Sequence, residues 1–360
     1  MNINGYELIG NLQNDKSGYA KWGFARKNGI EVFIKEFLSP VYPVDDSEIS
    51  KEQIQRKREI CASFEKEKRK FYDELGKCLT GNIITVLDFF RSGSRFYIVT
   101  EKVDAASIDV KEIAKLKIEQ KILISKIVLH NISTLHSHNI VHGDIKPDNI
   151  LLKKTVKGSY TAKIIDFDSG FLEGSAPQAG DDLQGDMVYL SPEAFMFIAN
   201  EAGTLTKKID IFSLGILLHQ YFCGEIPEFD KEKYDYLFEA VLDDGEIKIS
   251  DEIPDYFKST LLNMLSKHPA SRPQASEILQ LLQQDVKKVD AKESIKEPIE
   301  GDRLREIIEE AEYKLTGLKS GENSAESKSA LKSTMRKTND EKKTDEENEY
   351  TFFRKADDLL

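Results

Sequence analysis

The sequence has little of three things: cysteine, positive charge and uninterrupted apolar stretches. Its three cysteines are odd in number and lack the spacing of a metal site, which is typical of reduced thiols inside a cell. Lys and Arg total 51 against 63 Asp and Glu, which gives a formal net charge of -12. A surface of that charge attracts neither nucleic acid nor an anionic membrane overall. We therefore expect neither of them as a partner.

Targeting and membrane-spanning segments are also missing. The first residues, MNINGYELIG, have no basic segment followed by an apolar core, as a secretory signal would. The longest apolar stretches, such as IFSLGILLHQYF, are interrupted by polar residues well before the ~20 needed to cross a bilayer. These absences predict a cytoplasmic protein that does not insert into a membrane.

The periodicity of the apolar residues changes along the chain. Residues 5–35 alternate short β-like runs with Gly-containing turns, the pattern of an antiparallel meander. Residues 51–79 are strongly charged with apolar residues at helical spacing, and two more strand-like runs follow, NIITVLDFF and RFYIVTEKV. From residue 117 onward the spacing is mainly helical. A strand-rich first part and a helix-rich second part predict an α+β protein with two lobes.

The composition changes again after about residue 285. The tail is rich in Lys, Glu, Ser, Thr and Asn, which favours disorder because little apolar surface offsets the ordering entropy. Residues 302–318 are the exception, since their apolar side chains form one helical stripe. Near the end, Tyr350, Phe352 and Phe353 form an aromatic cluster that could dock the tail on its own lobe or on a partner. We slightly prefer intramolecular docking, and both remain open.

Residues 142–149, HGDIKPDN, carry a set of side chains suited to phosphoryl transfer. That chemistry needs a carboxylate to orient the attacking hydroxyl, a cation for the charge on the phosphoryl group, and oxygen ligands for Mg²⁺. Asp144, Lys146 and Asn149 fit these roles in turn. Asp166, in the apolar run KIIDF, supplies a second oxygen ligand for Mg²⁺.

These two segments resemble the catalytic loop and the metal-binding Asp motif of the protein kinase superfamily. Lys35 in VFIK is similar to the strand lysine that holds the α and β phosphates of ATP. GDMVYLSPEA at 185–194, DIFSLG at 210–215 and Arg272 follow in the family's order, which implies a pair between Glu193 and Arg272. The sequence KPDN resembles Ser/Thr kinases more than tyrosine kinases.

The resemblance covers about residues 5–285 and implies a bilobal protein-kinase fold. The N-lobe with the hinge would span residues 1–103, the C-lobe 104–285 and the tail 286–360. The implied cofactors are ATP and Mg²⁺, and the implied partner is a protein substrate. In the hinge, Thr100 would lie at the back of the adenine pocket, while backbone groups of Glu101 and Val103 would bond the base edge.

The family also pairs the strand lysine with a glutamate on the following helix. At about 100° per residue, one face of that helix contains Ile60, Phe64, Phe71, Leu75 and Cys78. Glu67 falls within this face and Glu65 points away from it. A carboxylate in an apolar stripe is costly to bury unless it meets a cation. Glu67 is therefore the expected partner of Lys35, with Glu65, or a solvated Glu67, as the alternatives.

The sequence departs from the family pattern around the nucleotide phosphates and the adenine. Gly18 stands in the place of the last glycine of the phosphate loop, but QNDKSG lacks the first two. Counting from Lys35, Ala20 replaces a usual Val and Phe33 a usual Ala, both over the adenine. One side chain shrinks as the other grows, so we expect a reshaped pocket that still takes a purine.

Two further departures concern control. Gly143 replaces the Arg that grips a phosphorylated activation loop in many relatives, and Ser175 is the only hydroxyl residue between Phe171 and Gly185. We therefore expect activity that does not require activation-loop phosphorylation. Asp168 replaces the Gly of the Asp-Phe-Gly motif, which restricts the backbone and makes a flip of this segment harder.

Two other functions compete with this interpretation. A small-molecule kinase of the aminoglycoside or choline type resembles the same Asp and Asn positions, but Lys146 and the segments SPE and DIFSLG oppose it. A pseudokinase scaffold would explain the degenerate phosphate loop. Against it stand the retained Lys35, Asp144, Lys146, Asn149 and Asp166.

Overall fold

The computed structural model describes residues 1–14, 20–44, 50–78, 81–103, 107–155, 158–177, 185–199 and 204–283. The chain divides into two units, Met1–Lys292 and Glu293–Leu360, and every described residue belongs to the first. Gly18, the expected helix at 302–318 and the aromatic cluster near the C-terminus lie outside the described residues.

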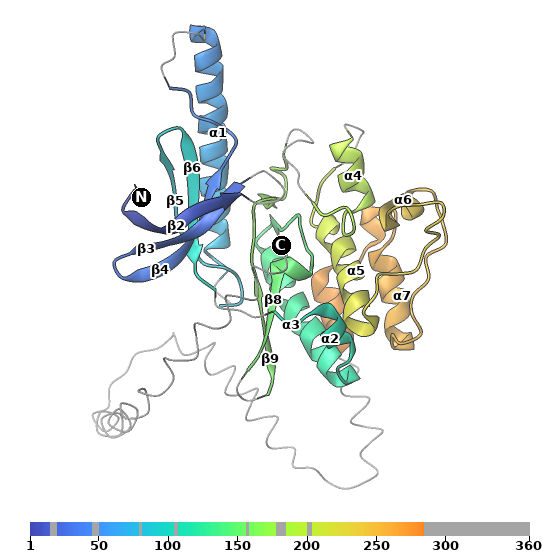
Figure 1. Cartoon of the computed structure of the whole chain (residues 1–360). Coiled ribbons are helices and arrows are strands. Elements are labelled where there is room, and N and C mark those ends of the chain that lie inside the picture. Colours follow the sequence, from blue (N-terminus) through green and yellow to red (C-terminus); the bar gives the residue numbers. More distant parts are fainter. Residues whose placement is uncertain are drawn as a thin grey trace, which may run out of the picture. The chain divides into compact units, whose positions relative to one another are not determined.

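The N-terminal part is a six-stranded antiparallel sheet (Figure 1). Its order is β1-β2-β3-β4-β6-β5, from the strands β1 (Asn2–Ile3), β2 (Tyr6–Asn14), β3 (Ala20–Lys27), β4 (Ile30–Phe37), β5 (Val86–Ser92) and β6 (Arg95–Glu101). Asn28 and Gly29 join β3 to β4, both with positive φ, as a two-residue hairpin turn requires. This turn fixes the register, which places Trp22 opposite Lys35 and Phe24 opposite Phe33.

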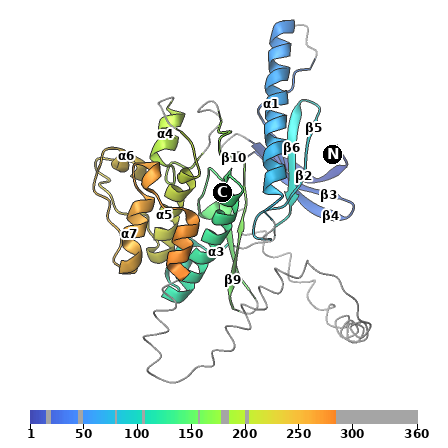
Figure 2. The same cartoon turned by 180° about the vertical axis from the view of Figure 1, so that it is seen from behind.

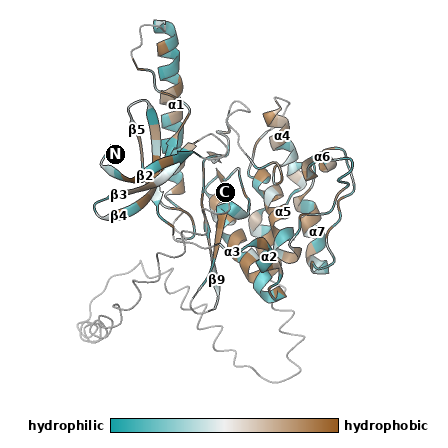
Figure 3. Cartoon of the chain, in the orientation of Figure 1, coloured by the Kyte–Doolittle hydropathy of each residue, from teal (hydrophilic) through white to brown (hydrophobic). Residues whose placement is uncertain are grey.

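One long helix, α1 (Lys51–Leu75), packs on this sheet, as Figure 2 shows from behind. It begins at a capping box in which Ser50 and Gln53 bond each other's backbone. Much of its surface is hydrophilic in Figure 3, in keeping with its charged sequence. Its buried side chains are Cys61, Phe71, Tyr72 and Leu75, which join one core with residues of β4, β5 and β6.

The rest of the unit is mainly helical. Its labelled helices are α2 (Val110–Ala114), α3 (Ile118–Ser137), α4 (Pro192–Ile198), α5 (Lys208–Cys223), α6 (Leu237–Leu242) and α7 (Asp255–Met264), and residues 275–283 are helical as well. Nearly every side chain of α5 is buried, so this helix forms the centre. Two short antiparallel pairs, β7 (Ile140–Val141) with β10 (Phe171–Leu172) and β8 (Ile150–Lys154) with β9 (Tyr160–Ile164), border the loops that carry the expected catalytic residues.

The predicted α+β architecture with a sheet-rich and a helix-rich part is confirmed. The expected helix around DIFSLG is α5, and the charged segment after residue 51 is α1. The limits of the lobes and of the tail stay predictions. In the described part of the chain, no helix is both long and apolar enough to cross a membrane.

Candidate active site

Asp210 of α5 fixes the backbone of the loop between β7 and β8. The two carboxylate oxygens of Asp210 accept hydrogen bonds from the backbone N–H groups of His142 and Gly143, each at 2.9 Å. His136 Nε2 lies 2.9 Å from the same carboxylate. Burial alone would raise the pKa of Asp210, but the bond from His136 outweighs it and the pKa is lowered. A charged Asp210 therefore holds the backbone from which Asp144 projects.

Gly143 is required by the shape of this loop. Its φ is +79°, and a Cβ atom there would lie 2.6 Å from the backbone oxygen of Ser169. A side chain at this position would thus face both a strained backbone and a collision with main-chain atoms that cannot rotate away. The structure adds this steric reason for glycine to the regulatory reason inferred from the sequence.

Replacing Gly143 with Ala is expected to destabilise the protein by about 1–3 kcal/mol, the usual range for a side chain forced into such a conformation. Thermal unfolding measures the change. Gly174→Ala is the matched control, because Gly174 has a φ of +86° but open space around its Cβ position. If Gly143→Ala costs no more than Gly174→Ala, the collision with Ser169 does not restrict this position.

The expected catalytic residues of this loop lie together. Asn149 donates from Nδ2 to Asp144 Oδ2 and to the Asp144 backbone oxygen, both at 2.8 Å, and Lys146 Nζ lies 2.9 Å from the same Oδ2. Asp144 Oδ1 accepts only a long bond of 3.3 Å from the Asp186 backbone, among the bonds of the described residues. One carboxylate oxygen is thus fixed, and the other remains able to accept a proton.

Asp166 follows β9 and is tied to the same loop through the bond from Ile165 N to Asn149 O, 3.0 Å long. It has a φ of +61°, in the left-handed region that few residues other than glycine adopt. Its Oδ1 pairs with Lys35 Nζ at 2.9 Å. Burial acts to raise the pKa of Asp166, but the charge of Lys35 outweighs it and the pKa is lowered, so the group is a carboxylate at neutral pH.

The side-chain oxygen atoms of Asn149 and Asp166 suit a magnesium ion. Asn149 uses Nδ2 for its bonds to Asp144, which leaves its amide oxygen, and Asp166 offers Oδ2; neither oxygen has a partner among the described residues. The described residues contain no group of three or more His, Cys, Asp or Glu that could hold a metal alone. Mg²⁺ commonly takes only one or two protein oxygens and completes its shell with phosphates and water.

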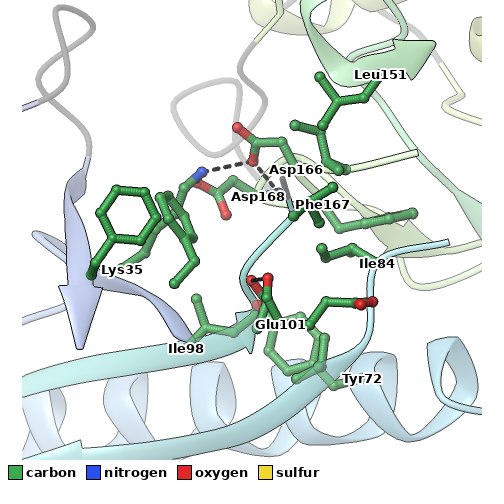
Figure 4. A pocket seen from close by; sticks show the side chains of 15 residues that line it. Lys35, Tyr72, Ile84, Ile98, Glu101, Leu151, Asp166, Phe167 and Asp168 are labelled. Atoms are coloured by element: carbon green, nitrogen blue, oxygen red, sulfur yellow. Dashed lines mark hydrogen bonds and ion pairs between the residues drawn. The ribbon is translucent and has the colours of Figure 1, made fainter. Parts of the chain in front are cut away.

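A cavity of about 240 Å³ lies beside these residues, between β4, β6 and the Asp166 segment (Figure 4). Its walls are mostly apolar, which suits a flat heterocycle. Lys35, Thr100, Glu101, Val103, Asp166 and Asp168 all line it. The cavity therefore brings together the expected lysine, hinge residues and metal ligand.

The expected hinge residues lie along one side of the cavity. Glu101 ends β6, and its side chain accepts bonds of 2.8 Å from Thr85 N and from Lys163 Nζ. Burial would raise the pKa of Glu101, but its bond to Lys163 and those to Thr85 lower it overall. Among the described residues, the Val103 backbone N–H has no partner, so it can donate to a base.

Ala20, expected over the base, is not among the residues that line this cavity, and its place there stays a prediction. Ala20 pairs with Phe37 at the end of β3 and does not line the cavity. Phe24 lines it instead, opposite Phe33, with the two ring centroids 5.8 Å apart. The residues of β3 and β4 that line the cavity are Phe24, Phe33 and Lys35, so no small side chain among them offsets the volume of Phe33.

Comparison with known proteins agrees with this geometry. A family model described as a protein kinase domain matches residues 48–282, well over half of the chain. The chain belongs to the protein kinase family. Within the match lie the catalytic loop, the Asp166 segment and α5, whereas Lys35 precedes it.

Several curated kinases are similar to this chain. The serine/threonine-protein kinase TIO of Arabidopsis thaliana is 29% identical over 192 residues, which are 53% of this chain and 14% of that protein. A probable myosin light chain kinase of Dictyostelium discoideum is 30% identical over 168 residues, 45% and 51% of the two chains. Calcium-dependent protein kinase 4 of Plasmodium berghei is 29% identical over 226 residues, 59% and 40%. The matches span at most about half of these relatives' lengths.

The buried pair expected in this kinase from the family's order is confirmed. Arg272 Nη1 and Nη2 donate to the two carboxylate oxygens of Glu193 at 2.6 and 2.8 Å. Arg272 also donates to the backbone oxygens of Lys208 and Ser266, so the guanidinium is bonded on several sides. The pair ties the start of α4 to the segment after α7.

The expected pair between Lys35 and Glu67 is wrong. Glu67 is exposed and accepts a 2.8 Å bond from Ser63 on its own helix, and the alternative, Glu65, pairs with Arg69 at 2.7 Å. Lys35 Nζ instead contacts Asp166 at 2.9 Å and Asp168 Oδ2 at 2.8 Å (Figure 4).

The reason is the rotation of α1 about its axis. Ile60, which the prediction placed on the inner face, is 52% exposed, whereas Cys61 and Tyr72 are buried. The true inner face is therefore centred about 90° away from Glu67 and close to Lys68. Lys68 Nζ donates to the backbone oxygen of Asp168 at 2.9 Å.

Sequence reasoning missed the roles of several residues in this site. Asp210 had a visible signal, because it is an acidic residue inside the apolar run IDIFSLGILL and such a residue needs buried partners. Lys68 and Asp168 had none, because their contact joins positions 100 residues apart. Phe24 could have been found from the Asn-Gly turn, which predicts a tight hairpin and hence its register.

Proposed function

We propose that this chain is a cytoplasmic Ser/Thr protein kinase that transfers the γ-phosphoryl group of MgATP to protein hydroxyl groups. The observation that carries the proposal is the state of Asp144, whose Oδ2 is fixed by Lys146 and Asn149 while Oδ1 stays available. A carboxylate held in this way, next to two oxygen ligands for Mg²⁺ and a lysine in an apolar cavity, has the arrangement that phosphoryl transfer requires.

The residues divide the reaction among them. The oxygen of the acceptor hydroxyl bonds to the γ-phosphorus as the bond from that phosphorus to the β–γ bridging oxygen breaks, leaving ADP. The hydroxyl proton passes to Asp144 Oδ1, which otherwise accepts only the long bond from the Asp186 backbone among the described residues. Lys146 Nζ, 2.9 Å from Asp144, places a cation where negative charge gathers on the phosphoryl group.

Three groups position the nucleotide for this step. Lys35 Nζ, on β4, is directed to the cavity and would hold the α and β phosphates. Asn149 and Asp166 would hold Mg²⁺, which when bound neutralises charge on the β and γ phosphates. The backbone of Glu101 and Val103 would bond the base.

Phosphorylation of the activation segment is not part of the proposed control. Gly143 has no guanidinium group that could bind a phosphate. A side chain at this position would also collide with the backbone of Ser169. Asp186 follows residues 178–184, which lie outside the described residues. Its side chain accepts a 3.0 Å bond from the backbone N–H of Val188, and its own backbone N–H donates to Asp144. Asp186 thus bonds this segment to the catalytic loop through groups that carry no phosphate.

Replacing Ser175, the only hydroxyl residue between Phe171 and Gly185, with Ala is expected to leave kcat and KM unchanged. The measurement compares initial transfer rates of phosphatase-treated wild type and the variant. Loss of activity in Ser175→Ala, together with a phosphate on Ser175 in active wild type, would show that this kinase depends on phosphorylation of its activation segment.

The class of acceptor separates this proposal from the small-molecule alternative. Purified protein is incubated with labelled ATP, Mg²⁺ and, separately, a generic protein, an aminoglycoside and choline. We expect label on Ser and Thr of the protein acceptor. Label found only on the sugar or the amino alcohol would contradict a protein kinase.

The remaining predictions about the whole chain rest on its sequence. We propose that the lobes end near residues 103 and 285, and that the tail from residue 286 docks on the chain's own lobe through Tyr350, Phe352 and Phe353. Their aromatic side chains, which form the only aromatic cluster in a charged tail, support this choice.

A further inference from the structure

The charges around Lys35 are arranged in the reverse of the family pattern described above. There, the helix supplies a carboxylate to the strand lysine and the third residue of the Asp-Phe-Gly motif supplies none. Here the helix presents a lysine, Lys68, and the third residue is Asp168. Both departures occur at one place, and they compensate each other in charge.

Asp168 contacts all the groups involved. Its Oδ2 lies 2.8 Å from Lys35 Nζ, its backbone oxygen accepts a 2.9 Å bond from Lys68 Nζ, and its backbone N–H points to Asp166 Oδ1 at 3.4 Å. The side chain of Lys35 is only 11% exposed, so water does little to screen these interactions. Two lysines and two aspartates thus form one cluster.

Asp166 cannot serve alone as the counter-ion of Lys35. In the proposed function, on which this inference rests, Asp166 gives its carboxylate to a metal ion and Lys35 must reach the phosphates. A lysine left without a carboxylate on the protein side would lose the contact that fixes its position. Asp168 is the other carboxylate bonded to Lys35 in the described part of the chain.

We propose that Asp168 is the positioning residue that replaces the helix glutamate as the counter-ion of Lys35, and that Lys68 links the position of α1 to it. The pair Asp168 and Lys68 then functions as a unit. Restoring the family's glycine at 168 leaves Lys35 and Lys68 facing a single carboxylate. Placing a glutamate at 68 alone sets a third carboxylate beside Asp166 and Asp168.

The consequence is an unusual pattern of mutational effects. Asp168→Gly and Lys68→Glu are each expected to weaken binding of a Mg²⁺-bound ATP analogue about tenfold, the size of one lost charged hydrogen bond. The double variant Asp168→Gly with Lys68→Glu restores the family's own arrangement, and its affinity is expected to return to within about threefold of wild type. Loss of structure alone would instead make the double variant worse than either single one.

The fluorescence of Trp22, the only tryptophan of the chain, can report this binding. Trp22 stands opposite Lys35 in the sheet and stacks on Phe33 of the cavity, with ring centroids 5.9 Å apart. The titration uses full-length protein, Mg²⁺ and an ATP analogue with an imido group at the β–γ bridge. Thermal unfolding verifies that each variant is folded.

Lys66→Glu combined with Asp168→Gly is the matched control, because Lys66 is exposed on the outer face of α1. This combination is expected to bind as weakly as Asp168→Gly. Asp168→Asn, which keeps the size of the side chain, takes the place of Asp168→Gly if the glycine variant does not fold.

Two results would overturn the inference: wild-type affinity in both Asp168→Gly and Asp168→Asn, or a double variant with Lys68→Glu that binds no better than its position-168 parent. The readout is separate from catalysis. A chain that shows the expected affinities but transfers no phosphoryl group keeps this inference and refutes the proposed function. A chain that transfers phosphoryl groups normally, but whose double variant binds the nucleotide no better than its position-168 parent, keeps the proposed function and refutes this inference.

Discussion

Replacing Asp144 with Asn is expected to lower kcat for phosphoryl transfer about 10²- to 10⁴-fold, the usual contribution of a positioned general base. The amide keeps the size of the side chain, but it can no longer accept the hydroxyl proton through Oδ1. Initial rates with labelled ATP and a protein acceptor measure the loss. Nucleotide affinity, followed by Trp22 fluorescence, is expected to stay at the wild-type value because Asp144 does not line the cavity.

Asp148→Asn is the matched control for this variant. Asp148 belongs to the same loop and undergoes the same chemical change, but its side chain is exposed. Its kcat is expected to equal that of wild type. An Asp144→Asn enzyme with a kcat close to that of Asp148→Asn would show that Asp144 is not the base.

Replacing Asp166 with Asn is expected to lower transfer about 100- to 1000-fold at a fixed, low Mg²⁺ concentration. The change removes the only carboxylate among the two expected metal ligands, and charge stabilisation by a bound metal contributes several kcal/mol to such reactions. It also removes the 2.9 Å partner of Lys35. Transfer rates measured over a range of Mg²⁺ concentrations test this.

The dependence on Mg²⁺ distinguishes a lost ligand from general damage. A weakened metal site is expected to recover part of its activity as Mg²⁺ is raised, whereas a misfolded one is not. Asp148→Asn should keep the wild-type dependence. An Asp166→Asn enzyme with an unaltered Mg²⁺ dependence would mean that the metal binds elsewhere.

The sequence predicted the catalytic loop well because its geometry is local. Asp144, Lys146 and Asn149 lie within six residues, and the loop that joins them is too short for alternative arrangements. The pair of Glu193 and Arg272 joins distant segments, yet it too was predictable, because it follows from the order of motifs in the family. The two-lobed architecture followed from the change of apolar periodicity along the chain.

The partner of Lys35 could not be predicted in this way. Most positions of α1 between residues 51 and 70 are charged or polar, so the few apolar residues define its inner face poorly. Including the exposed Ile60 rotated the predicted face enough to select Glu67 instead of Lys68. The contact between Lys35 and Asp168 spans 133 residues and depends on how the sheet lies over the Asp166 segment. No local pattern contains that information.

Phe24 was missed as a residue that lines the cavity. Its place there depends on the register across β3 and β4, which is set by the turn itself. The two-residue turn at Asn28-Gly29 brings Trp22 and Phe24 opposite Lys35 and Phe33.

The central claim is that this site transfers phosphoryl groups without a phosphate on its activation segment. Its most direct test is the initial rate at which phosphatase-treated, full-length wild type moves label from γ-labelled ATP to a protein acceptor in the presence of Mg²⁺. We predict linear transfer from the first time point, with ADP and phosphorylated Ser or Thr formed in equal amounts. Nucleotide binding reported by Trp22 with no transfer to any protein would contradict the account and indicate a scaffold.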